Sequence, residues 1–187
     1  MRILLAALAG AVAMFIWSAI AHMATPLAQM GFSQMTNEPA VLQAMTTENV
    51  SAKPGLFIFP WTDPKDPKMM EKYTELAKTH PTGMLLYRPV GQQLGADMAP
   101  MLIKEFLKQF VQALIAAWIA SLVVGGFDTR FAVVTGMFIS SGIAVNFSYW
   151  NWYHFPTSFT LAAIIMEIGS GIFAGAAIAW WLGRKTA

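Results

Sequence analysis

The side chains best suited to chemistry are a few polar groups within long apolar stretches. Glu167 is the carboxylate that lies deepest in such a stretch, and a charge at that depth in a bilayer is costly, so such residues are functional candidates. Three roles are open: a protonated carboxyl that holds helices together, a group that handles protons or ions, or a contact to a bound cofactor or partner. Counting depth along the other apolar segments gives the residues expected in its layer: Ser18, Gln112, Ser141 or Asn146.

Small residues share a helix face with Glu167. Gly171, Gly175 and Ala179 follow it at intervals of four, and Gly171 to Gly175 is a GxxxG pair of the kind that lets helices approach closely. We expect this face to be the packing seam of the last apolar segment, within the chain or against another subunit.

His22 ends the first apolar segment and is a candidate ligand to a haem iron or a pigment magnesium, or else a hydrogen-bonded interfacial histidine. The chain has no cysteine, and its histidines and carboxylates lack the close spacing of zinc or di-iron ligands. Its serines lack the Gly-x-Ser-x-Gly context, and its 13 methionines do not cluster. We therefore expect no catalytic set, no metal site and no cofactor of its own.

The charges are too few and too uneven for a soluble enzyme, a coiled coil or a disordered chain. Only 12% of the 187 residues are charged and the mean hydropathy is positive. No charge lies between Ile3 and Asn37, whereas 15 lie from Glu38 to Glu105. A spanning helix needs about 20 mostly apolar residues. The pattern predicts an all-α membrane protein with four transmembrane helices, at about Ile3–Ala24, within Met101–Val124, and at about Phe131–Trp150 and Phe159–Leu182.

The first apolar segment has a second interpretation as a signal peptide, since Ala19-Ile20-Ala21 imitates a cleavage site. Phe15 and Trp17 near that site favour a retained anchor. Basic residues flank the segments on one side, which predicts both termini in the cytoplasm: Arg2, Arg130, Arg184 and Lys185. The opposite side then carries an aromatic rim suited to the membrane interface, formed by Tyr149, Trp150, Trp152, Tyr153, His154 and Phe155.

Residues 26–100 form a polar insert, expected to be periplasmic and to fold as a small α+β module between residues 1–25 and the three-helix bundle of 101–187. The sequence predicts helices from about Glu38 and over Lys68–Thr79, and strands over Gly55–Pro60 and Gly83–Pro89. Parallel and antiparallel pairing both remain open. A module of this size is marginal alone, so we expect it to rest on the membrane or a partner. From Glu38 to Glu105 seven basic residues are matched by eight acidic ones and form no basic stripe, so nucleic acid is not an expected partner. The Gly91–Asp97 loop has no phosphate-binding spacing.

Four outer-face segments together resemble a family of small uncharacterised bacterial inner-membrane proteins with four helices and a periplasmic insert. The segments are Asn37–Val41, Pro54–Pro60, Pro81–Tyr87 and Ser148–Pro156, of which Tyr149–Tyr153 (YWNWY) is the most specific. The resemblance would cover nearly the whole chain and implies the same anchor, insert and three-helix layout. It implies no activity.

We expect an accessory or structural subunit of a bacterial inner-membrane complex, photosynthetic or respiratory, that docks through its insert and aromatic rim. Its partners would be lipid and other membrane subunits, and any pigment, quinone or haem contact would come through a partner. The alternative is a small transporter or proton-linked membrane protein centred on Glu167. A membrane-bound enzyme using Trp152 and His154 is a third class, and we do not expect an enzyme.

Overall fold

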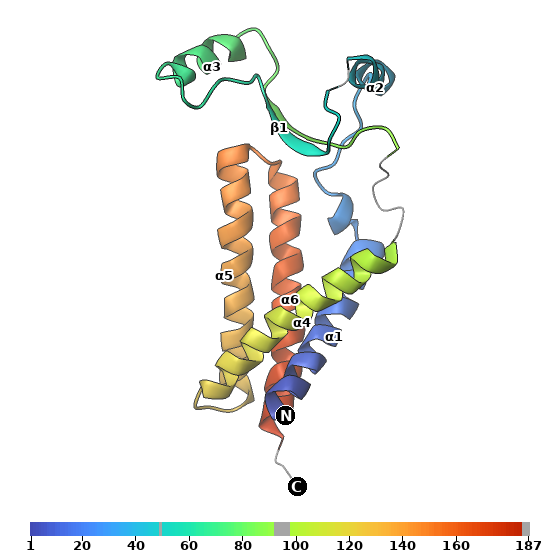
Figure 1. The fold of residues 1–187 in the computed structure, drawn as a ribbon. Coiled ribbons are helices and arrows are strands. Elements are labelled where there is room, and N and C mark those ends of the chain that lie inside the picture. Colours follow the sequence, from blue (N-terminus) through green and yellow to red (C-terminus); the bar gives the residue numbers. More distant parts are fainter. Residues whose placement is uncertain (49, 92–97, 185–187) are drawn as a thin grey trace. The chain divides into compact units, whose positions relative to one another are not determined.

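The computed structural model describes residues 1–48, 50–91 and 98–184, and within them the chain is mostly helical (Figure 1). Residues 92–97 of the predicted loop and Lys185 lie outside this part. The elements are α1 (Arg2–Met23), the short 3-10 helix η1 (Pro26–Gln29), α2 (Glu38–Thr47), β1 (Gly55–Phe59), α3 (Met69–Ala77), β2 (Gly83–Tyr87), α4 (Met98–Leu122), α5 (Phe127–Tyr153) and α6 (Thr157–Gly183).

Three of the described helices, α1, α5 and α6, are long and apolar enough to cross a membrane. These three agree with the predicted spans to within four residues at each end. The second predicted span corresponds to α4, which is long enough at 25 residues but carries Lys104, Glu105 and Lys108 in its first half. Its charge-free part, from Gln109 to Leu122, would be only about 21 Å long. Four transmembrane helices are therefore not confirmed.

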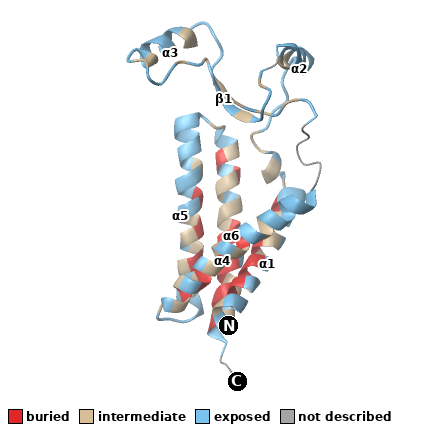
Figure 2. Ribbon diagram, viewed as in Figure 1, coloured by how far each residue is buried: buried red, intermediate tan, exposed pale blue. Residues whose placement is uncertain are grey.

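The chain divides into a helical unit, Met1–Phe32 with Asp97–Ala187, and an insert unit, Ser33–Ala96. In the helical unit α6 packs against α5 on one side and α1 on the other, and α4 packs mainly on α1 (Figure 1). The fully buried residues gather where α1, α4 and α6 cross (Figure 2). They are mostly small, and they include Ala6, Ala7 and Ala11 of α1 and Ala113, Ala116, Ala117 and Ala120 of α4. Small side chains allow these backbones to approach closely.

Both termini lie at the same end of the helical unit. The guanidinium of Arg2 donates hydrogen bonds to the main-chain oxygens of Leu182, at 2.6 Å, and of Arg184. Arg184 in turn stacks on Trp180, with its guanidinium carbon 4.1 Å from the ring centre. The start of α1 is thereby joined to the end of α6, so the two helices run antiparallel.

The insert unit begins at Ser33, later than the predicted boundary at residue 26. Residues from Pro26 to Phe32 belong with the helices, because the ring of Phe32 packs edge-on against Phe159 of α6, with ring centres 5.7 Å apart. Gly31 adopts φ of +91° directly beside Phe159, where any side chain would clash. A glycine is required at this close approach.

In the insert unit β1 and β2 pair antiparallel, which settles the open question of their direction. Leu56 lies opposite Leu86 and Ile58 opposite Met84, so these four side chains share one face of the sheet. No residue among 33–48 and 50–91 is fully buried, as Figure 2 shows. Two strands and two short helices without a buried core are marginal in water.

Candidate functional site

Three helices of the helical unit meet around Glu167, which lies in the middle of α6. The carboxylate lines a small groove of about 150 Å³, which we call the Glu167 groove, together with Gln112 of α4 and Ser141 of α5. Its apolar walls are Ile115, Met137 and Phe138. Glu167 is ten residues from the start of α6, a depth of about 15 Å along the helix. The groove thus brings one carboxylate, one amide and one hydroxyl together in apolar surroundings.

A glycine on α5 determines how closely Glu167 approaches that helix. A Cβ atom at Gly142 would lie 3.0 Å from the Cβ of Glu167, so a larger residue there would push the two helices apart. The main-chain oxygen of Gly142 also accepts a hydrogen bond from Asn146, at 2.9 Å. Asn146 therefore binds its own helix and is not among the residues that line the groove.

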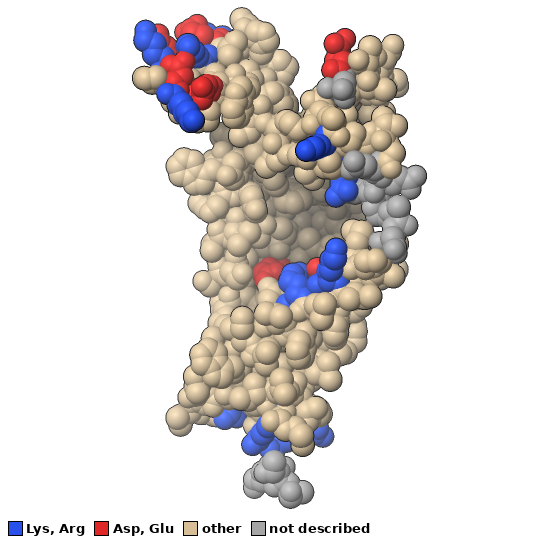
Figure 3. Space-filling model, viewed as in Figure 1, with Lys and Arg blue, Asp and Glu red and all other residues tan. Residues whose placement is uncertain are grey.

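A charged cluster on α4 lies beside the groove. Lys108 donates to Glu105 at 2.7 Å, and the buried Gln109 donates to the same carboxylate at 3.0 Å. Lys108 lies one helical turn before Gln112 on α4, so this cluster borders the α4 wall of the groove. Figure 3 shows a small group of acidic and basic side chains midway along the helical unit, with uncharged surface around it. The interpretation of the sequence overlooked this cluster, although Lys104, Glu105 and Lys108 stand out within a predicted span.

The predicted polar layer is only partly assembled. Gln112 and Ser141 line the groove with Glu167, whereas Ser18 does not. Instead, the main-chain oxygen of Ser18 lies 2.9 Å from Nδ1 of His22. His22 is exposed at the end of α1 and makes this contact within its own helix. The part of the chain that the structure describes contains no group of three residues arranged to hold a metal ion.

The small-residue seam of α6 faces α5. A Cβ atom at Gly171 would lie 2.6 Å from the Cβ of Phe138, and one at Gly175 would lie 2.8 Å from Oγ1 of Thr135. Thr135 also donates to the main-chain oxygen of Gly171 at 3.2 Å. Ala179, the last member of the predicted seam, is fully buried. The close contact is therefore within the chain.

A second close approach joins α6 to α1. The indole of Trp17 lies directly on Gly169, where a Cβ atom would come within 2.2 Å of the ring. Its Nε1 donates to the main-chain oxygen of Met166 at 2.9 Å, and its ring stacks on Phe173 with centres 5.3 Å apart. The residue before Glu167 is thus attached to α1, which holds α6 in position next to the groove.

The predicted aromatic rim forms one cluster where α5 ends and the chain turns into α6. His154 ends α5 in the left-handed conformation, with φ of +55°, and the turn places Phe155 on Tyr149 at 5.3 Å between ring centres. The indole of Trp150 donates to Oγ1 of Thr157 at 3.1 Å. Trp152 points outward and is 75% exposed. The rim is held by its own contacts and still leaves aromatic surface uncovered.

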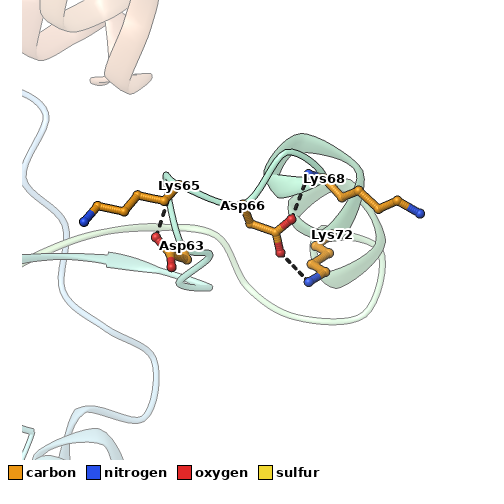
Figure 4. Close-up of polar contacts among 5 residues, drawn as sticks. All are labelled: Asp63, Lys65, Asp66, Lys68 and Lys72. Atoms are coloured by element: carbon orange, nitrogen blue, oxygen red, sulfur yellow. Dashed lines mark hydrogen bonds and ion pairs between the residues drawn. The ribbon is translucent and has the colours of Figure 1, made fainter.

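The insert unit has an open, charged hollow of about 700 Å³, bordered by Trp61, Asp63, Asp66 and the first turns of α3. The two aspartates stabilise the turns of the segment that leads into α3 (Figure 4). Asp63 accepts from the main-chain N–H of Lys65 at 2.9 Å, and Asp66 accepts from that of Lys68 at 2.8 Å. The ammonium of Lys72 and then the Lys68 N–H hold the pKa of Asp66 below its usual value. These bonds give the aspartates a structural role at the start of α3.

Comparisons of the chain with known protein families, with curated proteins and with solved structures found no match.

Proposed function

We propose that the protein is an accessory subunit of a larger bacterial inner-membrane complex and that its insert unit and aromatic rim are the docking surfaces. The observation that carries the proposal is the insert unit, in which no described residue is fully buried. Leu56 and Leu86 lie side by side on one sheet face and are 63% and 75% exposed. Such apolar surface on a marginally stable module is typical of a segment that is completed by a partner.

We further propose that α4 completes a four-span topology with both termini in the cytoplasm and the insert unit in the periplasm. Because α6 is antiparallel to both α1 and α5, α5 begins at the end where α1 begins (Figure 1). The chain leaves α1 at the opposite end of the helical unit. α4 therefore has to return the chain to the end where α5 begins. Basic side chains gather at the end that holds both termini, in agreement with a cytoplasmic side (Figure 3). Lys104 and Lys108 would extend from the first half of α4 towards the opposite interface.

The topology is tested by single cysteines, because the natural chain has none. Thr74→Cys in α3 and Gly126→Cys before α5 are expressed separately in a Gram-negative host with a permeabilised outer membrane. A maleimide that cannot cross the inner membrane should label Thr74→Cys in intact cells, and Gly126→Cys only after lysis. Labelling of both cysteines from the same side would contradict a crossing by α4.

The subunit function is tested by purification in a mild detergent from the native membrane. We expect a membrane protein in fixed stoichiometry, which is lost when Leu86→Lys charges the exposed sheet face. Thr74→Lys, an exposed change on α3, is the matched control and should keep the partner. A chain that purifies alone as a monomer or homo-oligomer would refute the subunit function.

A proton-linked or ion-linked function centred on Glu167 is the second candidate. It is favoured by the Glu167 groove, where the carboxylate lies within apolar walls beside Gln112 and Ser141. In liposomes containing a pH-sensitive dye, the chain should then carry proton or cation flux, and Glu167→Gln should abolish it without changing assembly. Flux that is absent, or equal in the two proteins, would remove this candidate.

A further inference from the structure

We propose that the Glu167 groove receives a membrane-spanning helix of a partner subunit and that a lysine or arginine of that helix pairs with the Glu167 carboxylate. The proposal rests on the proposed subunit function and adds a second, intramembrane contact to it. The evidence comes from the openness, the charge and the size of the groove.

The groove opens to the outside of the helical unit. Ser141 on its α5 wall is exposed, and Gln112 and Glu167 are half-buried. α4 packs mainly on α1 and touches α5 only sparsely, so no described helix of the helical unit covers the space between them. In a membrane this opening would face lipid, or another helix.

Glu167 has no ion-pair partner within the described residues. Three ion pairs occur there, and none includes Glu167. Lys108 of the neighbouring cluster on α4 is already bound to Glu105. A carboxylate facing lipid is costly unless it is paired. The chemistry that complements it is a cationic hydrogen-bond donor.

The size of the groove favours a side chain on a helix over a separate small molecule. At about 150 Å³ it is smaller than the 300–1,000 Å³ typical of small-molecule pockets. Exposed apolar residues continue the surface on both walls, with Val111 and Ile115 on α4 and Val145 on α5. A partner helix would pack along these residues and place one cationic side chain in the groove.

The test uses the purified full chain in liposomes and two synthetic transmembrane peptides. One peptide consists of about 20 leucines and alanines with a single central lysine, and the other has leucine at that position. A fluorophore on Val145→Cys, one helical turn from Ser141 on the exposed surface of α5, reports binding without filling the groove. The same fluorophore on Ile165→Cys, two residues from Glu167 and on another face of α6, is the control.

We expect the lysine peptide to bind about three- to fifteenfold more tightly than the leucine peptide at the Val145→Cys label, which is the range of single polar contacts between membrane helices. The Ile165→Cys label should show no such difference. Glu167→Gln in the Val145→Cys background should remove the preference while the helical content and detergent stability stay those of the parent. Glutamine has nearly the same shape, so a loss of folding is not expected.

Equal affinity for the two peptides, or a preference that persists in Glu167→Gln, would overturn the proposal. Displacement of the lysine peptide by dodecylamine at similar concentration would assign the groove to a small amphiphile instead and would also overturn it. If a partner co-purifies but the chain shows no peptide preference, the groove proposal fails and the subunit function stands. If the preference is found but no partner co-purifies, the subunit function fails and the affinity of the groove for a cationic helix stands.

Discussion

Replacing Gly171 by alanine tests the packing of α6 against α5 directly. The added methyl group would lie 2.6 Å from the Cβ of Phe138 and 3.3 Å from the main-chain oxygen of Thr135. Ordinary contact begins at 3.4 Å, so the first distance is short by about 0.8 Å. The obstructing atom is attached to the backbone and cannot rotate away. The helices therefore have to separate, which also stretches the 3.2 Å hydrogen bond from Thr135 to Gly171.

Inserting a methyl group into a well-packed interface costs about 1–3 kcal/mol. The higher helix propensity of alanine than of glycine offsets at most about 1 kcal/mol of this cost. We expect Gly171→Ala to lower the free energy of unfolding by up to about 2 kcal/mol, measured by far-UV circular dichroism as SDS replaces a mild detergent. The matched control is Gly136→Ala in α5, where the added Cβ meets nothing within 4 Å and stability should not fall. Equal stability of the two variants would refute the close packing of this seam.

Two further predictions concern polar contacts in each unit. Because the ammonium of Lys72 lowers the pKa of Asp66 in the folded chain, the stabilisation from this carboxylate is complete above its ordinary pKa of 3.8 and is lost as the pH falls through the lower folded value. Hydrogen-exchange protection of α3 should therefore decline below pH 3.8, and Asp66→Asn should reduce this protection at pH 6. Protection of α3 that does not change with acid would contradict a role of the Asp66 carboxylate. Trp17→Phe removes the 2.9 Å bond to Met166 and should lower the free energy of unfolding by about 0.5–1.5 kcal/mol, whereas Trp118→Phe, at an exposed indole, should change it little. An equal decrease in the free energy of unfolding in both variants would argue against the hydrogen bond from Trp17 to Met166.

The elements themselves could be predicted because their signals are local. A run of apolar residues, a proline near a helix start or a short run of apolar residues between turn residues acts within its own segment. α1, α5 and α6 and both strands follow these signals closely. α4 is the exception, since the same apolar run carries three charged residues and the composition alone does not meet the demands of a bilayer span.

The site could be predicted only in part, because depth in a helix does not determine the direction of a side chain. Depth alone predicts a layer of Ser18, Gln112, Ser141 or Asn146, and only Gln112 and Ser141 line the groove with Glu167. Asn146 binds its own helix and Ser18 is not among the lining residues, because side-chain direction depends on how each helix is rotated about its axis. That rotation is set by contacts such as Trp17 on Gly169, between residues 152 positions apart.

Side-chain hydrophobicity and local backbone preferences are readable along the chain. They locate the apolar segments, the polar insert, most helices and both strands, and they isolate Glu167 in an apolar stretch. The antiparallel direction of β1 and β2, the packing of α4 on α1 and the contact of Gly171 and Gly175 with α5 emerge only when the chain is folded. Each of these is a choice among arrangements with similar local energies, and the choice is made by steric fit between segments far apart in the chain.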